Sequence, residues 1–526
     1  GAPPPAFGAP TPKGIRAAAL GLALLLGAGN AAPQATLPFS EPSRAERVAN
    51  AVTEIDLARA EKLLAEAGSE TSALSFERAR LSVYRGDCAA AAATLARPEL
   101  LETKEGLSLQ KLAESCARAT AAGVIIEDKQ RGLWLRIQDD ADRALAPFLF
   151  DVAVKARDAI SRAVGIDLPR PLRIDLVRDL FSLSAVSGLP LEAAETTGTL
   201  AVARWGRVIL LSPRATPQGF PWEDTLTHEI THLIVTRATR DHAPLWLQEG
   251  MAKRLETSWR APRPFDEPAW ADGLAYRAIL EGRSVGIDQL GPSIAMLPTP
   301  EAASIAFAEV TSFVSYFART AGEPALHLLF ADLKGSGEHG ADVALRSITG
   351  HTLSEWNQRW QRDLLAGPAP STAPSFERGM TGRELARRVR LSDLLASEDR
   401  ARSAADEILP TITPQQREPS IRWRGGKALL EAGEATQAEA TLGALTEIGS
   451  VHGPWFGVRG RVLKARGQVA EAEEAFRVGI AVDPLAEDTA CEGERAPRGE
   501  KSVLGKLPED PARRELCLAA RARPRD

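Results

Sequence analysis

The sequence of 526 residues has no marked excess of charge, few aromatic residues and no long apolar run beyond its first 35 residues. Lys and Arg together number 64 and Asp and Glu 69, a net charge of -5, so composition gives no reason to expect nucleic acid or an anionic membrane as a partner. No later stretch reaches about 18 consecutive apolar residues, so we expect no membrane span in the mature chain. Aromatic residues make up 5% and alanine is abundant, which favours helices packed through small side chains.

The N-terminal region, residues 1–35, has the three-part layout of a secretory signal. Lys13 and Arg16 precede an apolar run over residues 17–29, and small residues follow at 30–32. The run is short for a transmembrane helix. We therefore expect an exported protein; the alternative for this segment is a buried helix of Ala and Leu.

Cysteine is also scarce, and its four copies fall into two local pairs. Cys88 is followed by Cys116 in the first part of the chain, and Cys491 by Cys517 in the last. Four cysteines allow three pairings, and sequence proximity is the only ground for choosing this one. We predict these two disulfides, formed in an oxidising compartment; four free buried thiols are the alternative.

The chain length suggests about three domains, and the apolar pattern changes along it. Residues 41–122 repeat apolar side chains at helical spacing, with Gly68 and Gly86 at positions suited to helix ends, which predicts helical hairpins. From Gly123 strand-like segments appear around a helix near Ala144–Val164, and only helical patterns follow Trp222, so residues 123–365 should form an α+β domain. The expected strands are Val124–Ile126, Leu133–Ile137, Leu172–Val177, Thr199–Ala203 and Arg207–Leu211.

A linker rich in Pro, Ala and Ser, residues 366–381, separates that domain from a repeat region, residues 382–486. Equivalent positions there lie 34 residues apart: Gly426 and Gly460, Gly433 and Gly467, Ala438 and Ala472, Leu442 and Phe476. This period, with its small, aromatic and proline positions, resembles the tetratricopeptide repeat. We expect an irregular C-terminal tail over 487–526, tied back by Cys517.

The motif that carries chemistry is His228-Glu229-Ile230-Thr231-His232. Two histidines four residues apart lie on one face of a helix, so both imidazoles can reach one ion. Glu229 can then contact a water molecule at the ion without binding the ion itself. Apolar residues along the same helix indicate that it is buried, as a rigid site requires.

Glu249 is the candidate third ligand. It lies in the segment PLWLQEGMAKRLE, where Pro244 is suited to the start of a second helix. If that helix folds back on the first, two His and one Glu bind the ion and leave a fourth position for water, the arrangement of a catalytic zinc.

HEITH followed by WLQEGMA resembles the gluzincin metallopeptidases, and within them the bacterial peptidase MA-like domains that often occur beside tetratricopeptide repeats. The resemblance covers roughly residues 123–365 and implies a zincin-like fold. It implies one zinc ion bound by His228, His232 and Glu249, with Glu229 as the base. It also implies a bacterial protein that is periplasmic or secreted.

The same resemblance implies an edge strand on which an extended peptide substrate pairs. Its residues would be Leu200, Ala201, Val202, Ala203 and Arg204. The segment that recognises a free N-terminus in related aminopeptidases has no equivalent, so an endopeptidase is favoured.

Two positions depart from the pattern of the group. Lys253 stands where thermolysin-like relatives have an Asp that orients a zinc-bound His, which leaves Asp224 and Glu256 as candidates for that role. Phe307 stands where many relatives have Tyr, a donor to the oxyanion. His242 and Tyr316 are the candidate donors, and Tyr316 is alternatively a core residue.

Three functions therefore remain open. The first is an exported zinc peptidase whose repeats recruit a protein substrate or partner. The second is a binding scaffold that carries a degenerate peptidase domain. The third is a zinc hydrolase that acts on the peptide amides of the cell wall.

Overall fold

The computed structural model describes residues 42–192, 194, 199–215, 220–262, 269–291, 293–336, 340–368, 382–413, 418–444, 452–491 and 511–521. The expected secretory signal and residues 369–381 of the expected linker lie outside this set. Among the described residues, no helix has the length and hydropathy needed to cross a bilayer.

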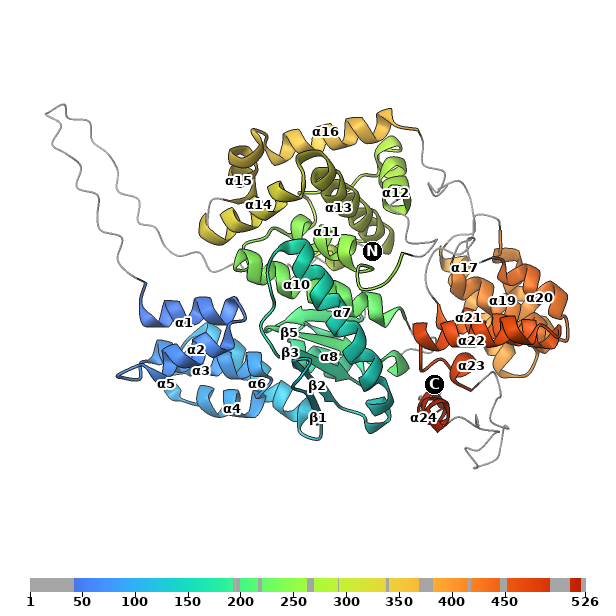
Figure 1. Cartoon of the computed structure of the whole chain (residues 1–526), viewed down its shortest axis with the longest axis horizontal. Coiled ribbons are helices and arrows are strands. Elements are labelled where there is room, and N and C mark those ends of the chain that lie inside the picture. Colours follow the sequence, from blue (N-terminus) through green and yellow to red (C-terminus); the bar gives the residue numbers. More distant parts are fainter. Residues whose placement is uncertain are drawn as a thin grey trace, which may run out of the picture. The chain divides into compact units, whose positions relative to one another are not determined.

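Six helices form the N-terminal part, as predicted for residues 41–122 (Figure 1). They are α1 (Arg44–Thr53), α2 (Leu57–Ala65), α3 (Ser72–Arg85), α4 (Cys88–Leu95), α5 (Pro98–Leu101) and α6 (Lys104–Thr120). A polar side chain accepts a hydrogen bond at the N-terminus of five of them: Ser43, Asp56, Thr71, Asp87 and Thr103. Gly86 ends α3 at φ 83°, a left-handed conformation that glycine adopts at no steric cost.

A mixed five-stranded sheet follows, and it confirms the predicted α+β class. Its strands are β1 (Val124–Asp128), β2 (Leu133–Ile137), β3 (Leu172–Val177), β4 (Ala201–Arg204) and β5 (Arg207–Leu211). The strand order is β1-β2-β3-β5-β4, so β1 and β4 are the edges. β2, β3 and β5 run parallel, with Ile174 opposite Leu135 on one side and Val208 on the other.

The two faces of the sheet are covered by different helices, because side chains alternate along a strand. Leu135 and Leu210 point to a core shared with α7 (Ala146–Val164) and α10 (Trp222–Thr239). Ile209 and Leu211 point the opposite way, toward α8 (Leu180–Ser187) and the N-terminal hairpins.

A buried ionic cluster lies on that second face. Asp175 of β3 pairs with Arg136 at 2.6 Å and with Arg207 at 3.2 Å. Arg136 also donates to the carbonyl oxygen of Gly86 at 2.8 Å, which joins the hairpins to the sheet. Burial lowers the pKa of Arg207 to about 10, although Asp175 opposes the shift. The N-terminal hairpins therefore pack directly on the sheet.

The rest of the central part is helical after α10, as predicted from Trp222 onward. Its further helices are α11 (Leu245–Leu255), α12 (Ala269–Leu280), α13 (Pro300–Ala321), α14 (Glu323–Ser336), α15 (Gly340–Thr349) and α16 (Leu353–Ala366).

The C-terminal helices are paired with the period expected from the sequence. They are α17 (Gly382–Ser397), α18 (Ala401–Ile408), α19 (Pro419–Glu431), α20 (Ala435–Leu442), α21 (Gly453–Ala465) and α22 (Val469–Val482). Gly426 of α19 packs against Leu442 of α20 so closely that a Cβ would lie 2.6 Å from its Cγ. Gly460 of α21 makes the equivalent contact with Phe476 of α22, at 2.8 Å. Two successive pairs thus share one packing geometry.

The tail was expected to be irregular, and this prediction is wrong for part of it. α23 (Glu487–Ala490) and α24 (Pro511–Arg521) are helical. Leu516 and Cys517 of α24 are buried, whereas Arg514 and Glu515 of the same helix are exposed, so a short amphipathic pattern was hidden among charged residues.

Both predicted disulfides are present. Cys88 at the start of α4 is bonded to Cys116 of α6, and Cys491 after α23 to Cys517 of α24. The described chain contains no free cysteine, so the alternative of four thiols is excluded.

Candidate metal centre

Two neighbouring helices, α10 and α11, carry the motif residues. The apolar side of α10 buries Leu226 and Ile230 in the central core, and α11 buries Trp246 and Leu247 in the same core. The short turn between the helices bends sharply because Arg240 adopts φ 53° and the next residue φ 64°. Pro244 is the N-cap of α11, immediately before the first turn of the helix.

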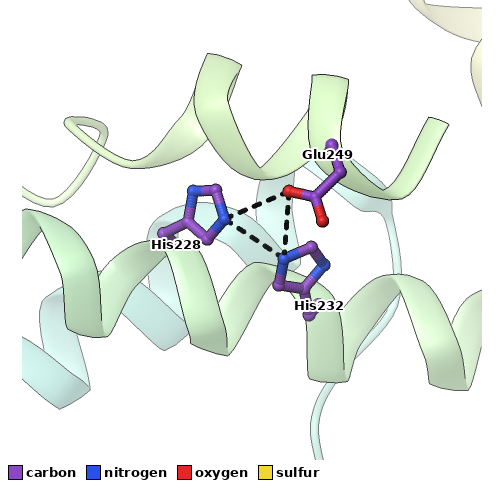
Figure 2. Close-up of side chains that lie close together, drawn as sticks. All are labelled: His228, His232 and Glu249. Carbon is purple, nitrogen blue, oxygen red and sulfur yellow. Dashed lines mark hydrogen bonds and ion pairs between the residues drawn. The ribbon is translucent and has the colours of Figure 1, made fainter. Parts of the chain in front are cut away.

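This packing brings His228, His232 and Glu249 to one point, as Figure 2 shows. Their ligand atoms all lie within 4.8 Å of one another. The Nε2 atoms of the two imidazoles are 3.1 Å apart, and Oε2 of Glu249 lies 3.5 Å from His228 Nε2 and 3.7 Å from His232 Nε2. In a tetrahedral zinc site with ligand distances near 2 Å, the ligand atoms are about 3.3 Å apart. The three distances therefore fit a divalent ion.

The hydrogen bonds of the two rings give a second test of that fit. Nδ1 of His228 faces Oε2 of Glu256 at 3.3 Å, and Nδ1 of His232 faces Oε1 of Gln248 at 3.1 Å. Both partners accept, so both Nδ1 atoms donate. In the neutral rings the two Nε2 lone pairs then face each other at 3.1 Å, an arrangement that a cation between them stabilises.

The electrostatic environment of His228 and Glu249 shifts the pKa of each residue. Burial disfavours a charged His228, but hydrogen bonds with Glu249 and Glu256 outweigh it and raise the pKa of His228 to about 9. Burial would raise the pKa of Glu249, but His232 and His228 lower it. The raised pKa of His228 and the lowered pKa of Glu249 both reflect opposite charges held close together at this point.

Glu229, the candidate base, follows His228 on α10. Its residue is 8% exposed. The described residues offer its carboxylate no hydrogen bond or ion pair, so it is free to accept a proton. The side chains of the three candidate ligands are 14 to 17% exposed, so each is partly accessible to solvent.

The groups that contact the candidate ligands are a residue of α11 and Glu256, the residue that follows α11. Glu256, one of the two orienting candidates, contacts His228, whereas Asp224 binds Trp259 Nε1 at 2.7 Å and Arg260 Nη2 at 2.8 Å. Among the described residues Asp224 is hydrogen-bonded to neither imidazole, so the prediction that it orients a histidine is wrong. Gln248, the partner of His232, was missed, although its place immediately before a ligand in WLQEG was a signal that could have found it.

The two departures from the gluzincin pattern meet near this site. Lys253 binds both carboxylate oxygens of Glu256, at 3.0 and 2.9 Å. Its Nζ also lies over the ring of Phe307, 5.7 Å from the centroid. The residue in place of the usual Asp thus contacts the carboxylate that orients His228.

The N–H or O–H donor of each candidate oxyanion residue is engaged in a hydrogen bond elsewhere. Nδ1 of His242 donates to the carbonyl oxygen of Leu333 at 2.9 Å, so its Nε2 is an acceptor when the ring is neutral. The hydroxyl of Tyr316 donates to Asp363 at 2.6 Å, and its ring packs edge-on against Trp356.

The expected substrate strand is an edge of the sheet, as predicted. β4 covers Ala201–Arg204 and, among the described residues, pairs with β5 only, while Leu200 lies just before it. β4 also contacts α10, which carries the two histidines, so a chain added to this edge would lie close to α10.

Comparison with known proteins adds no further support: no family model, no curated protein and no solved structure matches this chain. The likeness to gluzincins and to tetratricopeptide repeats rests on the residues themselves.

Proposed function

We propose that this protein is an exported zinc-dependent peptidase, built on a gluzincin-type zincin domain and flanked by tetratricopeptide-type repeats. The observation that carries the proposal is the meeting of His228, His232 and Glu249 beside an unpaired Glu229. The two disulfides support export, because such bonds persist in oxidising compartments.

The donor set favours zinc over other divalent ions. Two imidazoles and one carboxylate with solvent access are typical of catalytic zinc sites, whereas magnesium and calcium sites use oxygen ligands. When bound, zinc polarises a carbonyl group and acidifies a water molecule.

Residues of the chain would transfer the proton, orient the imidazoles and bind the peptide. Glu229 would take the proton of the attacking water on its carboxylate and deliver it to the leaving amine. Glu256 and Gln248 would hold the imidazoles with Nε2 toward the ion. The free edge of β4 would bind the backbone of an extended peptide, and the repeats would recruit the substrate or a partner.

Metal analysis and a cleavage screen test this proposal together. The purified protein should hold one zinc per chain and cleave casein or members of a peptide library, and a chelator should abolish cleavage. His228→Ala should lose both properties. Cleavage that persists without metal would contradict the proposal.

One observation favours a binding scaffold as the second candidate. Phe307 has no hydroxyl, and the donors of His242 and Tyr316 are engaged elsewhere. The scaffold would bind one zinc per chain yet cleave neither casein, a peptide library nor purified murein. Release of fragments from murein alone would instead identify the substrate as cell-wall peptide.

A further inference from the structure

Helix α11 and the residue that follows it supply one candidate ligand and a hydrogen-bond partner for each imidazole. Glu249 faces the two imidazoles, Gln248 accepts from His232, and Glu256 accepts from His228. The two rings are held differently: a neutral amide holds His232, whereas a carboxylate holds His228. Gln248 in turn donates to Thr236 of α10 at 3.3 Å, so its amide oxygen is turned toward the ring.

Glu256 is itself held by a cation. Lys253 binds both of its oxygens, and its side chain is 30% exposed, against 23% for Glu256. Lys253 also lies one helical turn after Glu249 and interacts with it electrostatically. A positive charge therefore stands beside a site built for a divalent cation.

We propose that Glu256 is a positioning residue of the metal centre and that Lys253, through Glu256, weakens the hold of His228 on the ion. This inference rests on the proposed metal site. A carboxylate that accepts from Nδ1 fixes the ring and raises the basicity of Nε2, which strengthens the bond to a metal. An ammonium group on the same carboxylate withdraws part of that negative charge and also repels the ion.

The two residues therefore have opposite effects on metal affinity, although they form one ion pair. Removing the charge of Glu256 should weaken zinc binding, and removing Lys253 should strengthen it. A pair that only braced α11 would behave otherwise: loss of either partner would loosen the helix and weaken binding alike.

The test is the zinc affinity of the full chain, measured by competition with a chromophoric chelator. Glu256→Gln should raise Kd by about 10- to 100-fold. Lys253→Met should lower Kd by roughly three- to tenfold, because it removes a unit charge close to the ion. In the double variant the gain from Lys253→Met should shrink, since it acts through Glu256.

Two control variants leave this network intact. Arg254→Met removes the neighbouring cation of α11, and Glu323→Gln removes its partner; neither contacts Glu256 or a ligand. Both should leave Kd unchanged.

The outcomes that overturn the inference are separate from those that overturn the function. Wild-type affinity in Glu256→Gln, or weaker binding in Lys253→Met, would reject the inference while the metal site stands. A wild-type chain that binds no zinc would reject the proposed function and the inference with it. Thermal unfolding of each metal-free variant shows whether a loss of binding reflects a loss of folding.

Discussion

Glu229 is the residue on which the proposed chemistry depends. It is nearly buried beside His228 and has no hydrogen bond or ion pair with the described residues. Glu229→Gln keeps the shape of the side chain but cannot accept a proton, so zinc content should be unchanged and kcat should fall by several orders of magnitude. Zinc analysis and single-turnover peptide cleavage measure the two effects. Equal cleavage by the variant would remove Glu229 from the mechanism.

Asp175 is a second residue whose role lies in its charge. It is 1% exposed and stands between Arg136 and Arg207. Asp175→Asn leaves two buried guanidinium groups without an anion, so the free energy of unfolding should fall by about 3–5 kcal/mol. Urea unfolding measures it. Asp140→Asn, which breaks an exposed pair with Arg143, is the matched control and should change stability little.

The residues around the metal ligands also mark how far sequence reasoning reached. The three candidate ligands and Glu229 were chosen from a spacing within one helix and a motif in the next. Glu256 was one of two candidates, and Gln248 was not considered. Their roles depend on how α10 and α11 cross, which residue spacing alone does not determine.

At the scale of elements, α21 begins at a histidine with an unusual environment. His452 is the N-cap of α21 and accepts from the backbone N of Trp455 at 3.2 Å. Burial, together with the positive charge of Arg424, lowers the pKa of His452 to about 3, although Asp488 opposes the shift. The neutral ring therefore stabilises the folded state.

The pH dependence of stability follows from that shift. The unfolded chain binds the proton below about pH 6.5, whereas the folded chain does so only near pH 3. The contribution of His452 is thus complete above pH 6.5 and is lost as pH falls toward 3, by up to about 2 kcal/mol at pH 5.

His452→Asn tests this dependence, since Asn is a good N-cap that does not titrate. Urea unfolding, followed at the C-terminal helices, should show that the free energy of unfolding falls less between pH 7.5 and pH 5 in the variant than in the wild type. Identical losses would show that His452 titrates normally in the folded chain.

Elements were predicted better than their contacts. All five strands and the helix near Ala144–Val164 lie where the apolar patterns placed them, because each pattern is local. α24 was missed, since its buried residues lie in a polar stretch of the sequence that is rich in charged residues and proline. The repeat period appeared as a shared packing geometry because a glycine faces a large apolar residue in each pair, Leu442 in one and Phe476 in the other.

At the scale of the whole molecule, metal binding should be linked to stability. An ion that binds only the folded chain stabilises it by about 2.7 kcal/mol at a concentration 100 times Kd. Zinc should therefore raise Tm of the chelator-treated wild type by a few degrees, increasingly with concentration. Differential scanning calorimetry measures the shift. His228→Ala should show none; an equal shift in that variant would place the stabilising zinc elsewhere.

Sequence by itself determined the class of fold, the position of the strands and most helices, the disulfide partners and the three candidate metal ligands, because each follows from local spacing or from a pair of nearby cysteines. Tertiary structure alone decided that Asp175 lies between two buried arginines and that Gln248 and Glu256 contact the imidazoles. Those contacts join side chains from different strands or depend on the sharp turn between two helices, so they exist only once the elements have packed.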